Sequence, residues 1–120
     1  MKRGIITNNG AVIQISDGEV WMTSWEIADL FYTTTRAISS RIKTILKANI
    51  LKEYEVRQCI RLENGSSADV YNLNMIIALS YQVDTGHSAA FRKWLINKFT
   101  SKQKDISLFI PIRLANTYNC

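Results

Sequence analysis

Residues 22–47 read MTSWEIADLFYTTTRAISSRIKTILK, and this stretch predicts two helices joined by a short polar turn. Thr23 is placed to cap the first helix, and Glu26, three residues on, can complete a capping box. Residues 32–34, YTT, break the helical spacing of the apolar residues and suit a turn or a second N-cap. Helix, short turn and helix is the helix-turn-helix pattern, and it is the strongest indication of function in the sequence.

The second helix of this pair is predicted to have an apolar face and a basic face. Its aliphatic residues recur at three- and four-residue steps: Ile38, Ile42, Ile45 and Leu46. Polar residues occupy the opposite arc and its flanks: Arg36, Ser39, Ser40, Arg41, Lys43, Thr44 and Lys47. Residues 33–47 contain four cations and no carboxylate. A face of this kind suits phosphates and base edges, although a basic face is also found where a helix is merely solvated.

We therefore expect residues 34–47 to enter the major groove of double-stranded DNA. Arg36 and Lys43 are the candidates for phosphate or guanine ligands, while hydroxyls contact phosphate or base edges. The predicted nucleic-acid-binding set includes two cations from a later hairpin: Thr34, Arg36, Ser39, Ser40, Lys43, Lys47, Arg57 and Arg61.

Length and composition indicate one domain that buries a core without metals or disulfides. The chain has 120 residues, of which 47% are hydrophobic and 21% charged, the proportions of a soluble globular protein. Its net charge of +5 favours a polyanionic partner. Cys59 and Cys120 cannot build a disulfide framework or a metal site, so we expect a reducing cytoplasm. Residues 1–10 lack the apolar segment of a signal peptide, and the longest apolar run, 75–79, is too short to span a membrane.

Short strands are predicted on both sides of the helix pair. Residues 4–22 carry Asn-Gly and Asp-Gly hairpin signals, which predict a small antiparallel sheet ahead of the helices. Residues 54–62 and 68–73 flank a polar loop and predict a second hairpin with Arg57 and Arg61 on one face. A hairpin directly after a helix-turn-helix is typical of a wing, which lies along phosphates, but it can equally be a hairpin that covers the core.

Two further helices and an apolar tail complete the predicted fold. Asn72 or Asn74 is expected to cap a mostly buried helix through residues 75–83, and Ser88 to cap another through residue 104. The last helix has an apolar stripe, which we assign to the core: Phe91, Trp94, Leu95 and Phe99. Its five cations and lack of acids between residues 88 and 104 are compatible with a phosphate-facing surface or with a basic helix end.

Residues 105–120 surround Pro111, the single proline, and predict an edge strand or an extended arm. So apolar a tail needs a partner surface, either on its own domain or in a homodimer. The predicted class is α+β and winged-helix-like, with a domain at 1–104 and the tail at 105–120.

Three motifs in order resemble the RhuM-like virulence-protein family of bacteria. They are GEVWMTSWEIADLF at 18–31, YNLNMIIALSYQV at 71–83 and GHSAAFRKW at 86–94. The chain is more distantly similar to the N-terminal domains of phage antirepressors, of the Bro-N and KilA-N types. The resemblance spans residues 18–99 and implies a DNA-binding or repressor-antagonising module of a mobile element, with no catalytic residue to carry over.

Catalysis is not predicted from these residues. The single histidine, His87, lies in a predicted polar turn, where it is expected to be a cap or a surface residue. The acids near the hairpin are expected to pair with Lys52, Arg57 and Arg61 rather than to bind a metal. No cofactor is expected. The alternative to a DNA-binding domain is a protein-interaction module of antirepressor type, in which the helix pair is structural and the hairpin or tail binds a partner protein.

Overall fold

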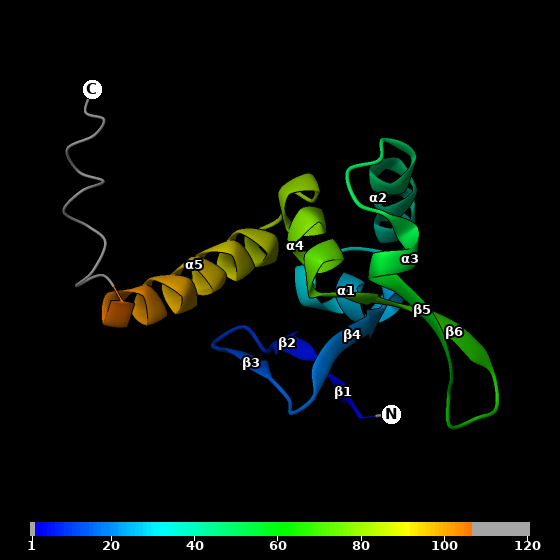
Figure 1. Cartoon of the computed structure of the whole chain (residues 1–120), viewed down its shortest axis with the longest axis horizontal. Helices are drawn as coiled ribbons and strands as arrows, with labels where there is room; N and C mark the ends of the chain where they lie inside the picture. Colours follow the sequence, from blue (N-terminus) through cyan, green and yellow to red (C-terminus); the bar gives the residue numbers. More distant parts are fainter. Residues whose placement is uncertain (1, 107–120) are drawn as a thin grey trace.

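The computed structural model describes residues 2–106, with side chains through residue 101. In this part the chain is an α+β fold with a small sheet and five helices (Figure 1). The strands are β1 (Arg3–Gly4), β2 (Ile6–Asn8), β3 (Ile13–Ile15), β4 (Glu19–Thr23), β5 (Arg57–Arg61) and β6 (Ser67–Asn72). The helices are α1 (Ser24–Phe31), α2 (Thr35–Lys47), α3 (Glu53–Val56), α4 (Leu73–Gln82) and α5 (Gly86–Ile106).

The main sheet joins N-terminal strands to a hairpin from the middle of the sequence. Over residues 2–106 its four strands have the order β1-β4-β6-β5. β4 pairs antiparallel with β6, and Trp21 lies opposite Asn72. β1 pairs with β4 in parallel, where Gly4 lies so close to Gly18 that a Cβ on Gly4 would be 2.3 Å from the Gly18 carbonyl oxygen. The prediction of a separate N-terminal antiparallel sheet is therefore wrong for β4, because its antiparallel partner is the later hairpin.

The predicted N-terminal hairpin does form, as the two-stranded pair β2–β3, with Ile6 opposite Ile15. Its turn is held locally by asparagine side chains. The Gly10 amide donates to Asn8 Oδ1 at 2.8 Å, and Gly10 adopts a φ of 96° that favours glycine.

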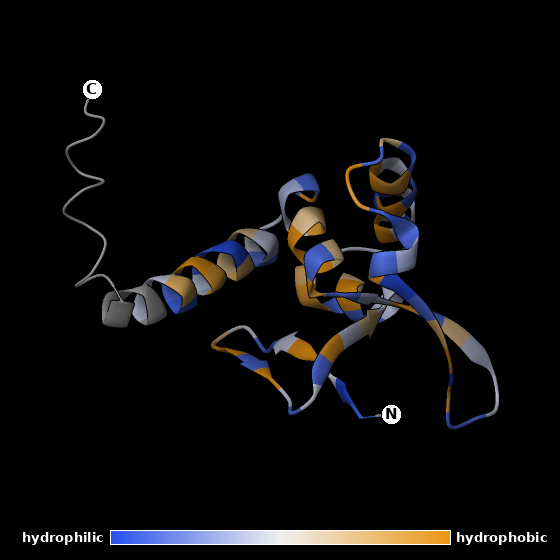
Figure 2. Cartoon of the chain, in the orientation of Figure 1, coloured by the Kyte–Doolittle hydropathy of each residue, from blue (hydrophilic) through white to orange (hydrophobic). Residues whose placement is uncertain are grey.

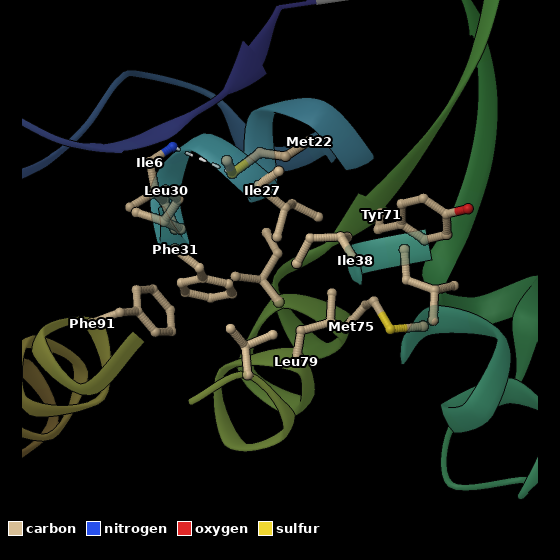
Figure 3. Close-up of a cluster of buried hydrophobic side chains, with 14 of the residues drawn as sticks. Ile6, Met22, Ile27, Leu30, Phe31, Ile38, Tyr71, Met75, Leu79 and Phe91 are labelled. Carbon is tan, nitrogen blue, oxygen red and sulfur yellow. Dashed lines mark hydrogen bonds between the residues drawn. The ribbon is translucent and has the colours of Figure 1, made fainter. Parts of the chain in front are cut away.

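The core lies where α1, α2, α4 and α5 meet, and side chains of β2, β4 and β6 pack into it. Figure 3 shows Phe31 of α1, Ile38 of α2, Leu79 of α4 and Phe91 of α5 converging in it, and all four are fully buried. α1 packs against α2 and α5, and α2 packs against α4. The later helices thus support the helix pair from the C-terminal side of the sequence.

Two predicted boundaries are wrong. Residues 53–56 form the helical turn α3, so that the strand begins at Arg57 rather than at residue 54. α5 begins at Gly86, and Thr85 and Ser88 together form its cap instead of Ser88 alone.

The core assignment of Phe99 is also wrong, because its side chain is 64% exposed on the part of α5 that projects beyond the core (Figure 1). The predicted edge strand or arm and the homodimer through it fall mainly on residues 107–120, outside the described residues. No helix in residues 2–106 combines the length and hydropathy needed to cross a membrane.

Candidate nucleic-acid interface

The entry to the helix-turn-helix is fastened by the predicted capping box. Thr23 Oγ1 accepts the Glu26 amide at 3.2 Å, and Glu26 Oε1 accepts the Thr23 amide at 2.8 Å. Arg3 donates to the same carboxylate at 2.8 Å, and also to the Trp21 carbonyl oxygen. Burial raises the pKa of Glu26, but the hydrogen bonds from Arg3 and Thr23 and the Arg3 charge outweigh it, so that the pKa lies below its usual value. β1 is thereby tied to the start of α1.

The turn of the helix pair carries a tyrosine where glycine is usual. Tyr32 has φ 55° and ψ 56°, in the left-handed region. Its amide donates to the Asp29 carbonyl at 3.2 Å, and the Thr33 amide donates to the Ala28 carbonyl at 2.9 Å, which together form a Schellman motif. Thr34 then caps α2 by accepting the Ala37 amide at 3.1 Å, as predicted. Thus α1 ends and α2 begins within three residues.

The N-terminal end of α5 braces this turn. Thr85 Oγ1 donates to the Phe31 carbonyl oxygen at 2.6 Å, which satisfies one of the free carbonyls at the end of α1. The Tyr32 ring stacks on His87, with 5.1 Å between the ring centroids. His87 is therefore a packing partner of the turn, placed in the first turn of α5.

α2 presents the predicted faces. Ile38, Ile42 and Ile45 are buried in the core. Of the polar residues predicted for the basic face and its flanks, Ser39 is half-buried. The others are exposed: Arg36, Ser40, Arg41, Lys43, Thr44 and Lys47. Among the side chains described, ion pairs engage Arg3 and Arg57 but no cation of α2. Arg41, which is not in the predicted set, is also exposed, on the flank of this face opposite Ser39.

A groove of about 560 Å³ runs between α2 and the β5–β6 hairpin. Ser39, Lys43 and Lys47 line it from α2, and Arg57 lines it from β5. The structure thus brings together four of the eight predicted nucleic-acid-binding residues, three from the helix and one from the hairpin.

Arg57 has close acidic neighbours in this groove. Its guanidinium pairs with Glu53 of α3, and at 3.4 Å with Asp69 of β6. Burial, followed by the charge of Asp69, raises the pKa of the neighbouring Tyr71 hydroxyl. The expected pairing is confirmed for Arg57, whereas among the described side chains neither Lys52 nor Arg61 forms an ion pair with an acid. A phosphate would have to compete with two carboxylates for this arginine.

Arg61 occupies a different hollow. Its guanidinium donates to the Gly65 carbonyl at 3.3 Å, within the hairpin tip. Arg61 lines a hollow of about 810 Å³ with Arg3, Trp25 and Glu26, apart from the α2 side chains. The sequence placed Arg57 and Arg61 together on one strand face, whereas the tertiary structure gives them different neighbours.

Over the described range, no three side chains of histidine, cysteine, aspartate or glutamate are grouped to hold a metal ion. Cys59 lies in β5, as predicted, with an exposed free thiol. The basic face of α2 and its groove are thus the candidate interface.

Comparison with family models, curated proteins and solved structures finds no match to this chain.

Proposed function

We propose that this chain is the DNA-binding domain of a cytoplasmic bacterial transcriptional regulator, of winged-helix-like type, RhuM-like and linked to a mobile element. The observation that carries the proposal is the exposed side of α2, on which Arg36, Lys43 and Lys47 lie on one face and Arg41 on its flank, with no acid in the helix. A basic stripe whose described cations form no ion pair favours a polyanion with regularly spaced charges.

The dimensions of α2 suit the major groove. Its 13 residues make a helix about 20 Å long at about 1.5 Å per residue. A major groove about 12 Å wide admits such a helix. In this proposal Arg36 and Lys43 bind phosphate or guanine, and Thr34, Ser39 and Ser40 contact phosphate or base edges.

The β5–β6 hairpin takes the place of a wing. It extends away from the helices, and its base lies beside α2 across the groove that holds Arg57 (Figure 1). Arg57 and Arg61 would then approach the phosphate backbone next to the groove that α2 enters.

The test is fluorescence anisotropy of a labelled random-sequence duplex at several salt concentrations. The variant Arg36→Ala/Lys43→Ala loses two cations from α2. The control, Lys2→Ala/Lys93→Ala, loses two exposed cations elsewhere. We expect the α2 variant to bind at least about tenfold more weakly, with a salt slope reduced by about two, and the control to change much less.

Equal losses in the two double variants would show that only net charge matters, and would overturn the assignment of α2. Negligible duplex binding at low salt would favour the protein-interaction module instead. If the duplex binds as expected, selection of preferred sequences from a random pool follows, because a base-reading arginine changes preference at one position whereas a phosphate-binding lysine weakens all sequences alike.

A further inference from the structure

A second surface lies on α5 and the β2–β3 hairpin, on the opposite side of the molecule from α2 (Figure 1). It exposes large apolar side chains that are not buried in the core. Val12 is 50% exposed, Ile15 44% and Phe99 64%. Figure 2 shows hydrophobic residues on both of these elements. Exposed apolar side chains that gather on one surface mark interaction sites in soluble domains.

Trp94 lies at the centre of this surface. Three hollows, of about 600, 670 and 440 Å³, are each lined by Trp94, which is half-buried between α5 and the hairpin. Its ring packs against buried Phe91 at 5.7 Å between centroids, so the floor of the surface is anchored to the core. We call these residues the Trp94 surface: Val12, Ile15, Lys93, Trp94, Lys98 and Phe99.

The charges on the Trp94 surface have one sign. Lys93 and Lys98 line the hollows, and among the described lining residues there is no carboxylate. The Lys98 ammonium lies 5.3 Å from the centroid of the Trp94 ring, at the edge of the apolar area. A peptide segment that carries both carboxylates and apolar side chains would complement the lysine charges and the exposed apolar area together.

Two other occupants fit less well. A second copy of the chain would bring lysines against lysines, which costs free energy when desolvated. Single-stranded nucleic acid stacks its bases on aromatic rings, but Val12 and Ile15 offer aliphatic surface that bases do not use. The combination of aliphatic, aromatic and cationic side chains is that of a site for an amphipathic peptide.

We propose that the Trp94 surface binds an acidic amphipathic segment of a partner protein. Apolar residues of the segment fill the hollows beside Trp94, and its carboxylates pair with Lys93 and Lys98. This inference does not depend on DNA binding by α2. It gives the domain a protein contact on the side away from the duplex, so that both partners can bind together.

The experiment uses two labelled 18-residue helical peptides with the same leucine stripe, one with glutamate and one with lysine at the polar positions. Anisotropy is measured against the full chain. We expect saturable binding of the glutamate peptide and none of the lysine peptide. Val12→Ser/Phe99→Ser should weaken binding about tenfold or more, because it removes apolar contact without changing charge. Ile50→Ser is the matched control, since Ile50 is 57% exposed between α2 and α3, and it should leave binding unchanged.

Circular dichroism checks that each variant keeps its helix content, and Lys98→Gln provides a second variant that also weakens binding of the glutamate peptide. Failure of the full chain to bind the glutamate peptide overturns the proposal, as does equal weakening by Ile50→Ser. Dimers in sedimentation equilibrium that Phe99→Ser abolishes would identify a second copy as the occupant. Displacement of the peptide by a 20-nucleotide thymidine strand, lost in Val12→Ser/Phe99→Ser, would identify nucleic acid instead.

Discussion

The Tyr32 ring lies stacked on the His87 imidazole, with 5.1 Å between their centroids and 24° between their planes. Tyr32 is the left-handed residue of the helix-turn-helix, and His87 is in the first turn of α5. The left-handed conformation costs a non-glycine residue about 1–2 kcal/mol, and an aromatic pair returns about 0.5–1.5 kcal/mol. The contact therefore explains how a tyrosine occupies this position.

A double-mutant cycle tests this balance. Tyr32→Gly alone should change the free energy of unfolding by less than about 1 kcal/mol, because relief of backbone strain opposes the loss of stacking and the greater freedom of the unfolded chain. In a His87→Ala background the same change should be more favourable by about 0.5–1 kcal/mol. Urea denaturation of the four proteins measures both values, and strictly additive effects would contradict the coupling.

Thr85→Val should destabilise the domain by about 1–2 kcal/mol. The hydroxyl of Thr85 donates to the Phe31 carbonyl at 2.6 Å and accepts the Ser88 amide at 3.0 Å, and valine can do neither. Thr44→Val is the control, because the exposed Thr44 hydroxyl donates only to the Ser40 carbonyl on the surface of α2. Thermal unfolding compares the two variants, and a loss at Thr44 as large as that at Thr85 would rule out a special role for the brace.

Glu26 should give the domain a pH-dependent stability. Its pKa is lower in the folded state than the usual 4.5. Its contribution is therefore fully present above that unfolded value, and is lost as the pH falls through the lower folded pKa. Glu26→Gln should lower the free energy of unfolding by about 1 kcal/mol at pH 7. Below pH 4.5 the free energy of unfolding of the variant should decrease less steeply with falling pH than that of the original protein. Urea denaturation midpoints at pH 7 and at acid pH test this. If the variant loses stability at acid pH as steeply as the original protein, other carboxylates cause the loss.

Asp69→Asn should strengthen duplex binding several-fold, more than an equal charge change elsewhere. The substitution removes a carboxylate from the groove beside α2 and releases one of the two ion pairs of Arg57. Glu19→Gln is the control, since Glu19 is exposed at the start of β4 and changes the net charge equally. Both should leave stability nearly unchanged, because exposed ion pairs contribute little. Equal gains in the two variants, measured by anisotropy, would show that Arg57 is not involved.

Local chemistry explains which features could be predicted. The Thr23–Glu26 capping box, the Thr34 cap and the buried stripe of α2 each depend on residues within a few positions of one another, and the structure confirms all three. The sequence also predicts the turn at Tyr32, although a left-handed residue at the end of a helix is usually glycine. Its stabilising partner is 55 residues away in the sequence, where no local pattern points to it.

By itself the sequence determined the helix pair, its basic face and the two hairpins. The spacing of apolar residues in a helix or strand indicates which side chains face the core. Only the tertiary structure decided that β4 pairs with β6, that Arg57 rather than Arg61 forms ion pairs among the described side chains, and that Phe99 is exposed. These outcomes depend on which elements become neighbours in space. Many arrangements of the same elements bury similar apolar area, and packing and pairing between distant segments select one of them.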